Sequence, residues 1–298
     1  MTTLTLSPEV MPAHDAPIKM LRCSRSGRYL ATGDTDLFVK IWEGDREVLE
    51  VDPHSRDEKI RPTENIRGIE FSADEEHVYV AASDTLNAYR ISTGELEWQY
   101  RPPRHFGFLI VSPQAIAVSP SGEIAASFNY GSMACFSPTG EMLWRRGENY
   151  APRFLAFCPQ GKALVGAEAF NLCVWDAVSG DLLHRWPLDN KVFAMAASPI
   201  ESLVVTRELH TVSIYDISEF TRICQLPAGR GLPCLAVSGR DRLLATGEKH
   251  RIRQINLECQ GVGDIPVDET SVLSVAFSAD GSEILAGCAD GTVRRWRV

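Results

Sequence analysis

The sequence lacks the features that mark membrane-spanning and exported proteins. No run of about 18 apolar residues, the length a membrane helix needs, occurs in the 298-residue chain. The N-terminus has neither the basic start nor the apolar core of a signal peptide. We therefore expect a cytoplasmic protein with no membrane partner.

Basic residues are scarce relative to acidic ones. The chain has 30 lysines and arginines against 39 aspartates and glutamates, which gives a formal net charge of −9. Binding to nucleic acid depends on clustered lysine and arginine that neutralise phosphates. The charge balance therefore disfavours nucleic acid as a partner.

Motifs for catalysis are also missing. Gly161 and Lys162 are followed by Ala163 and lack the upstream glycine of a Walker loop, and no GxSxG segment is present. The histidines are too widely scattered for the short spacings of a zinc site, and the carboxylate-rich turns 74–76 and 280–283 are interpreted as solvated surface. We predict no catalytic residues, no metal and no cofactor.

The eight cysteines include no CxxC pair. Five of them lie within predicted strands: Cys23, Cys135, Cys173, Cys234 and Cys288. We interpret them as small buried hydrophobes in a reducing compartment rather than as disulfide partners.

What the sequence does contain is a motif that recurs seven times. Its register residues are Ser24, Ser72, Ser119, Cys158, Ser198, Ser238 and Ser278. The first two intervals are 48 and 47 residues and the others 39 or 40, close to the roughly 40 to 45 residues of a four-stranded propeller blade. Around each register residue, alternating apolar positions, a turn rich in Ser, Pro, Gly and Asp, and a second apolar run indicate strand, turn and strand. We predict an all-β fold, a single seven-bladed β-propeller over residues 1–298 with four antiparallel strands per blade.

An aromatic residue closes the third predicted strand in four units, at Trp42, Trp175, Tyr215 and Trp296. The segments FVKIW, LCVWD, VSIYD and GTVRRW resemble the closing signature of the WD-repeat family, and Asp36 and Asp290 stand where that family places its turn aspartate. The literal dipeptide occurs only at Trp175–Asp176, and no unit opens with Gly-His. Units two and three are also similar to the repeats of pyrroloquinoline-quinone enzymes, with Thr-Gly and a tryptophan four residues beyond the glycine. Both families build the same blade.

The two chain ends suggest how the ring closes. The last unit stops at Val298, directly after its third strand, and therefore lacks an outer strand. The alternating residues 3–6, TLTL, are expected to supply it, which would leave no open sheet between the first and last blades. The alternative is a frayed N-terminal tail.

Two long intervals mark candidate binding loops. Insertions at 52–65 and 101–113 fall between an outer strand and the next inner strand of neighbouring units, so we expect them side by side on one face. The first contains Arg61, and the second combines Arg104 and His105 with Phe106 and Phe108. Aromatic residues beside arginine are typical of interface anchors. The alternative is that the phenylalanines pack over the blade edge.

A further asymmetry lies five residues before each register residue. The polar residues Lys19, Arg67, Gln114 and Arg153 stand there in four consecutive units, followed by Phe193, Pro233 and Leu273. We predict a mouth that is basic on one side and apolar on the other, complementary to an acidic peptide with a hydrophobic anchor. The WD-repeat resemblance implies that peptides bind at this end. The alternative is a set of solvated strand ends that share no ligand.

These observations predict a non-catalytic scaffold that binds a partner protein or peptide as a component of a larger assembly. The alternative function is a small-ligand sensor or a propeller enzyme that uses the central channel.

Overall fold

The computed structural model describes residues 7–53, 66–107, 109–147, 152–168, 170–229, 234–248, 250–267 and 270–298. Every regular element in these ranges is a β-strand, and the strands form seven four-stranded antiparallel sheets. The predicted seven-bladed β-propeller is therefore confirmed. The chain divides into two compact units, Met1–Asp34 with Asp189–Val298 and Thr35–Leu188.

The first unit contains three complete blades and two strands of a fourth. Its strands are β18 (Ala194–Ala197), β19 (Leu203–Arg207), β20 (Thr211–Asp216) and β21 (Thr221–Pro227); β22 (Leu235–Val237), β23 (Leu243–Glu248), β24 (Arg251–Asn256) and β25 (Gly261–Pro266); β26 (Val272–Phe277), β27 (Glu283–Cys288), β28 (Thr292–Arg297) and β1 (Glu9–Pro12); and β2 (Ile18–Cys23) and β3 (Tyr29–Asp34).

The second unit has the same composition of blades. Its strands are β4 (Val39–Glu43) and β5 (Arg46–Val51), which with β2 and β3 make the seventh sheet; β6 (Ile66–Phe71), β7 (His77–Ala82), β8 (Thr85–Arg90) and β9 (Leu96–Tyr100); β10 (Pro113–Val118), β11 (Ile124–Phe128), β12 (Ser132–Phe136) and β13 (Met142–Arg146); and β14 (Phe154–Phe157), β15 (Ala163–Glu168), β16 (Asn171–Asp176) and β17 (Leu182–Pro187).

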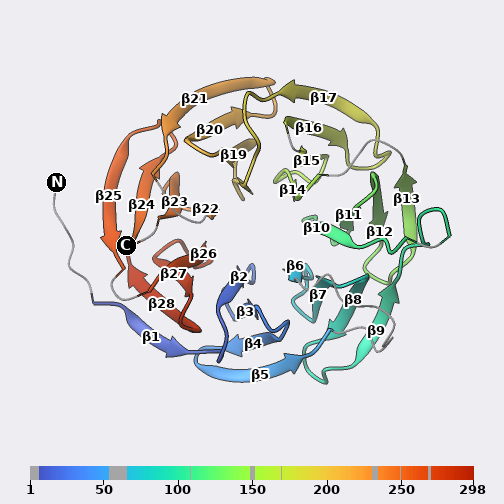
Figure 1. Ribbon diagram of the computed structural model, residues 1–298, viewed down its shortest axis with the longest axis horizontal. Coiled ribbons are helices and arrows are strands. Elements are labelled where there is room, and N and C mark those ends of the chain that lie inside the picture. The colour runs from blue at the N-terminus through green and yellow to red at the C-terminus, as the bar shows by residue number, and fades with distance from the viewer. Residues whose placement is uncertain are drawn as a thin grey trace. The chain divides into compact units, whose positions relative to one another are not determined.

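An N-terminal strand completes the last blade, as the sequence predicts. β1 pairs antiparallel with β28, from Glu9 opposite Arg295 to Pro12 opposite Thr292. It is the outermost strand of the order β1-β28-β27-β26, and Figure 1 shows it in blue beside the red β28. The residues that form it are Glu9–Pro12. Residues 3–6, which the sequence favoured for this place, lie outside the described residues.

The hydrophobic core lies between neighbouring blades. In the second unit, Tyr79 and Leu86 of one blade pack with Ile124, Phe128 and Phe136 of the next. A middle strand is therefore covered on both faces, so β7 and β11 read as nearly unbroken apolar runs with almost every residue buried. The aromatic residues that close the third strands, Trp42, Trp175, Tyr215 and Trp296, are all buried.

Two blades of the second unit are each fastened to the next blade by a tryptophan of the outer strand. Trp98 in β9 donates its indole N–H to the carbonyl of Pro138 at 3.0 Å, and Trp144 in β13 donates to that of Ala177 at 2.9 Å. The rings cover Gly140 and Gly180, where an added Cβ would lie 2.8 Å from ring atoms. Both glycines have a positive φ, so they provide the left-handed turn and leave room for the indole. These contacts give a physical role to the tryptophans of the second and third repeats and to the glycine of the third, Gly140.

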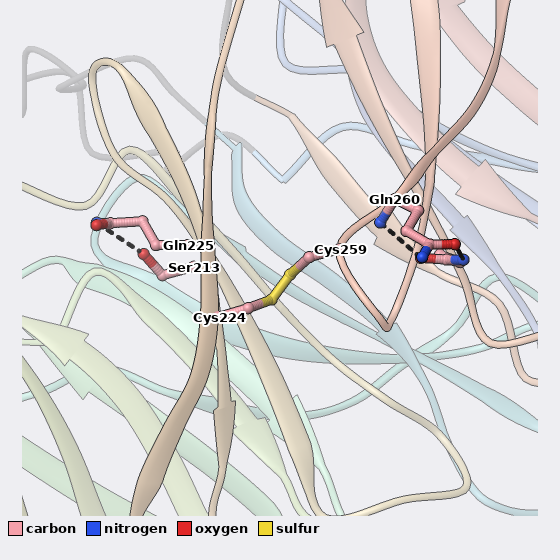
Figure 2. The surroundings of a disulfide bond; sticks show 6 residues. Ser213, Cys224, Gln225, Cys259 and Gln260 are labelled. Atoms are coloured by element: carbon pink, nitrogen blue, oxygen red, sulfur yellow. Dashed lines mark hydrogen bonds between the residues drawn. A yellow bond between two sulfur atoms is a disulfide. The ribbon is translucent and has the colours of Figure 1, made fainter.

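The cysteine prediction is correct for most residues and wrong for one pair. Cys135, Cys173, Cys234 and Cys288 are free and buried, and Cys23 is free and half-buried. Cys224 in β21 and Cys259 in the β24–β25 turn form a disulfide between neighbouring blades, with a Cα–Cα distance of 6.5 Å. Figure 2 shows this bond between the Ser213–Gln225 hydrogen bond and Gln260. The two cysteines belong to different repeats, so the spacing of cysteines within one repeat does not indicate the bond.

Candidate functional site

The candidate residues of the second unit gather at one end of its blades. In the first complete blade, the start of β6 pairs with the end of β7, and the start of β8 pairs with the end of β9. The start of β10 pairs with the end of β11 in the next blade. We call this end, where inner strands begin and outer strands finish, the leading end. Loop 101–112 and the β11–β12 turn both lie there.

Loop 101–112 is held at its base by buried polar contacts. Arg101 forms an ion pair with the buried Asp84 at 3.1 Å. At the far end, the backbone N–H of Ser112 donates to Asn129 Oδ1 at 2.8 Å, and that of Asn129 donates to the carbonyl of Ser112 at 3.0 Å. Arg104, which is exposed, lines a small pocket with Asp84 and Arg101. The loop therefore has a fixed base, and the insertion lies between β9 and β10 as the sequence predicts.

The tip of this loop exposes aromatic rings. Phe106 is 78% exposed, so it does not pack over the blade edge. Its ring centroid lies 4.0 Å from that of His105. His105 also stacks on Tyr130 of the β11–β12 turn, with ring centroids 4.9 Å apart and planes 3° from parallel. Sequence reasoning selected His105 and Phe106 but missed Tyr130, which stands in a different repeat.

Three of the residues chosen five positions before a register residue lie at the leading end of the second unit. Arg67 and Gln114 are the second residues of β6 and β10, and Arg153 directly precedes β14. The inner strands β6 and β14 both contact β10. Partial burial and the positive charge of Arg153 lower the pKa of Arg67. Among the described residues, no ion pair joins either arginine to a carboxylate.

The remaining candidates belong to the first unit or lie outside the description. Lys19 is exposed in β2, and Leu273 is half-buried in β26, which contacts β2. Phe193 is partly exposed, and the Lys191 ammonium lies 5.6 Å from its ring centroid. Arg61, Phe108 and Pro233 lie outside the described residues.

Buried acidic side chains at the ends of the second strands are a feature that sequence reasoning missed. Asp34 accepts a hydrogen bond from His14 Nδ1 at 2.8 Å, and His14 Nε2 lies 2.7 Å from Thr32 Oγ1. Glu248 accepts from the backbone N–H of Gly229 at 3.0 Å and from Arg251 at 2.6 Å. Each contact ties the end of a second strand to a neighbouring segment. These carboxylates are therefore committed to structure rather than presented to a substrate.

Neither a metal site nor a membrane span is found in the described ranges. No three His, Cys, Asp or Glu side chains gather there as a metal ion would require. No helix of that part of the chain is long and apolar enough to cross a membrane.

Comparison with known proteins supports the resemblance seen in the repeats. The family model described as "WD domain, G-beta repeat" matches residues 7–43 and 260–297, which contain β1 to β4 and β25 to β28. A segment of 116 residues is 31% identical to the small ribosomal subunit protein RACK1z of Oryza sativa subsp. japonica. The aligned segment covers 36% of this chain and 35% of the rice protein, so it spans about a third of each.

Proposed function

We propose that this seven-bladed β-propeller, two segments of which match the WD-repeat family model, is a non-catalytic scaffold that binds a partner protein at the leading end of its blades. The rice relative is named as a protein of the small ribosomal subunit. We extend from it the general role of a component in a larger assembly.

Two neighbouring arginines, Arg67 and Arg153, which form no ion pair with any carboxylate in the described part of the chain, are the observation that carries this proposal. On a chain with a net charge of −9, a partly buried arginine whose pKa is lowered by burial and by a second arginine, with no ion pair to a carboxylate of the described residues, is costly to keep for stability alone. An acidic group of a partner relieves their repulsion and forms bidentate hydrogen bonds with a guanidinium. Gln114, on the strand between them, adds a neutral hydrogen-bonding side chain.

The apolar part of the partner is proposed to meet the phenylalanines. Loop 101–112 offers Phe106 beside Arg104 and His105 in the second unit, and Phe193 is partly exposed in the first. Lys19, Arg61 and Phe108 belong to the same proposed set. An acidic peptide with a hydrophobic anchor fits this combination of charge and apolar surface.

A double charge reversal tests the proposal. Capture of the partner that copurifies with the wild type is expected to weaken as the salt concentration rises, and Arg67→Glu with Arg153→Glu is expected to abolish this capture. The matched control is Lys162→Glu with Arg46→Glu, which changes the net charge equally at exposed residues of the same unit outside the leading end. If the first variant retains its partner and its salt dependence, the site is wrong. A ligand-dependent rise in Tm without any protein partner would instead favour the small-ligand sensor.

We also propose a cytoplasmic location, which the Cys224–Cys259 disulfide opposes because such bonds persist mainly in oxidising compartments. Alkylation of free thiols at the moment of cell lysis, followed by mass spectrometry of the peptides that contain Cys224 and Cys259, distinguishes a cytoplasmic location from an oxidising compartment. Alkylated residues are expected in the cytoplasm, and a disulfide-linked peptide pair would refute this location.

A further inference from the structure

Two exposed aromatic residues at the leading end occupy backbone positions that aromatic residues rarely take. Phe106 has φ of 50° and is followed by Gly107 at 81°, and Tyr130 has φ of 59° and is followed by Gly131 at 83°. Two successive positive φ values characterise the tight turns whose first central position favours Asn, Asp or Gly. A bulky side chain in this conformation is strained. Stability alone would favour other residues at both positions.

The strained residues are brought together by one contact group. His105 contacts both rings, with its ring centroid 4.0 Å from that of Phe106 and 4.9 Å from that of Tyr130. Phe106 and Tyr130 are 78% and 49% exposed, so their outer surfaces face solvent. We call these three side chains the aromatic shelf. Strain together with exposure at one place points to binding rather than to folding.

The charge beside the shelf selects the kind of partner. Segments 101–113 and 127–134 contain no aspartate or glutamate, whereas the loop contains Arg101, Arg104 and His105. The charge of Arg101 is neutralised by its ion pair with Asp84 at 3.1 Å. No ion pair joins Arg104 to a carboxylate of the described residues, and Arg104 directly precedes the shelf.

We infer that the aromatic shelf, with Arg104, binds a peptide segment of a partner protein in which an aromatic side chain stands next to carboxylates. The aromatic side chain stacks against Phe106 and Tyr130, and a carboxylate pairs with Arg104. This inference rests on the proposed scaffold function and identifies the anchor of that interaction.

Replacement of both strained aromatics by asparagine separates binding from stability. Asparagine tolerates the left-handed conformation better than phenylalanine or tyrosine, so Phe106→Asn with Tyr130→Asn is expected to leave Tm unchanged or raised. The probe is a fluorescein-labelled peptide enriched on the full chain from a phage-displayed random library. The enriched sequences are expected to carry an aromatic residue flanked by Asp or Glu. The double variant is expected to weaken binding of the probe about tenfold or more.

Phe220→Asn is the matched control. Phe220 is also a partly exposed phenylalanine with a positive φ of 52°, but it lies in the β20–β21 turn of the first unit. It should gain stability in the same way while probe affinity stays at the wild-type value. Arg104→Gln should reduce both the affinity and its dependence on salt.

The inference is overturned if no peptide is enriched, if the enriched peptides lack acidic or aromatic residues, or if the shelf variant binds the probe within twofold of wild type. Capture of the native partner distinguishes the two proposals. A partner that is lost with Arg67→Glu and Arg153→Glu but kept with Phe106→Asn and Tyr130→Asn refutes the shelf and leaves the scaffold function standing. Failure of wild type and all variants to capture any protein refutes the scaffold function.

Discussion

Removal of the disulfide between Cys224 and Cys259 should measurably destabilise the first unit. The bond closes a loop with a sequence separation of 35 residues. The loss of chain entropy in the unfolded state by such a cross-link corresponds to about 4 kcal/mol. For a protein of this length, that free energy lowers Tm by about 6 °C. Cys224→Ser is expected to show this loss in urea or thermal unfolding without reductant.

A second substitution separates the cross-link from the backbone strain at Cys259. Cys259 has φ of 66°, a conformation that costs a residue with a side chain about 1 kcal/mol relative to glycine. Cys259→Gly should therefore lose only about 3 kcal/mol without reductant, because it breaks the bond but relieves the strain. In dithiothreitol the order of the free energies of unfolding changes. Wild type and Cys224→Ser should then unfold together, and Cys259→Gly should be about 1 kcal/mol more stable than both.

The assay has an independent check in the thiol count. The chain has eight cysteines, of which six are free. The protein unfolded without reductant should therefore expose six reactive thiols, and eight after reduction. Eight thiols without reductant, or equal unfolding midpoints for wild type and Cys224→Ser under those conditions, would refute the reasoning.

Three further outcomes follow from single contacts. Gly180→Ala should cost about 3 kcal/mol because it combines a positive φ with a clash against the Trp144 ring, whereas Gly44→Ala, with a positive φ but open space around it, should cost about 1 kcal/mol in urea unfolding. Replacement of the buried His14 by alanine removes two side-chain contacts and should cost about 3 kcal/mol in the same assay. Hydrogen bonds from Ser278 and Ser282 lower the pKa of Asp280 to about 2. This group therefore stabilises the folded state above pH 4 and loses that effect as pH falls toward 2, and an NMR titration should find a higher pKa for Asp280 in Ser278→Ala.

The fold was predictable because the repeated residues perform a repeated local task. The hydroxyl of Ser24 accepts a hydrogen bond from the backbone N–H of Tyr29, five residues on. The same bond joins Ser72 to His77 and Ser278 to Glu283. Such a contact lies within one turn and depends on residue type, so it leaves a periodic signal in the sequence. The spacing of this signal was sufficient to count the blades.

The candidate site was only partly predictable, because its contacts join different repeats. Loop 101–112 was visible as an insertion, and its arginines and phenylalanine were identified from composition. Tyr130 and Asp84 were not identified, since each contacts the loop from a turn in a neighbouring part of the unit. The N-terminal strand was expected from strand alternation, but pairing with β28 selected Glu9–Pro12. Alternation alone does not choose between adjacent segments with similar patterns.

The position of the disulfide is explained by a contact between neighbouring blades that recurs in several blades. We call this contact the joint. The joint places an outer-strand side chain against the residue with positive φ in the last turn of the following blade. In the second unit that residue is glycine, and the partners are Leu49 with Gly94, Trp98 with Gly140, and Trp144 with Gly180. Ile214 and Cys135 stand the same number of residues after the register residues of their repeats, Ser198 and Ser119. Cys224 pairs with Ile214 as Trp144 pairs with Cys135, so Cys224 occupies the position of Trp144 in its own blade. Cys259, with its positive φ, takes the place of the glycine. A tryptophan ring covers the glycine of the next blade with a large apolar surface, which is possible only because glycine has no Cβ. A cysteine side chain is too small to fill the same space by packing. A covalent bond provides the cross-blade connection there instead, and it accounts for a cysteine being kept in a conformation that favours glycine.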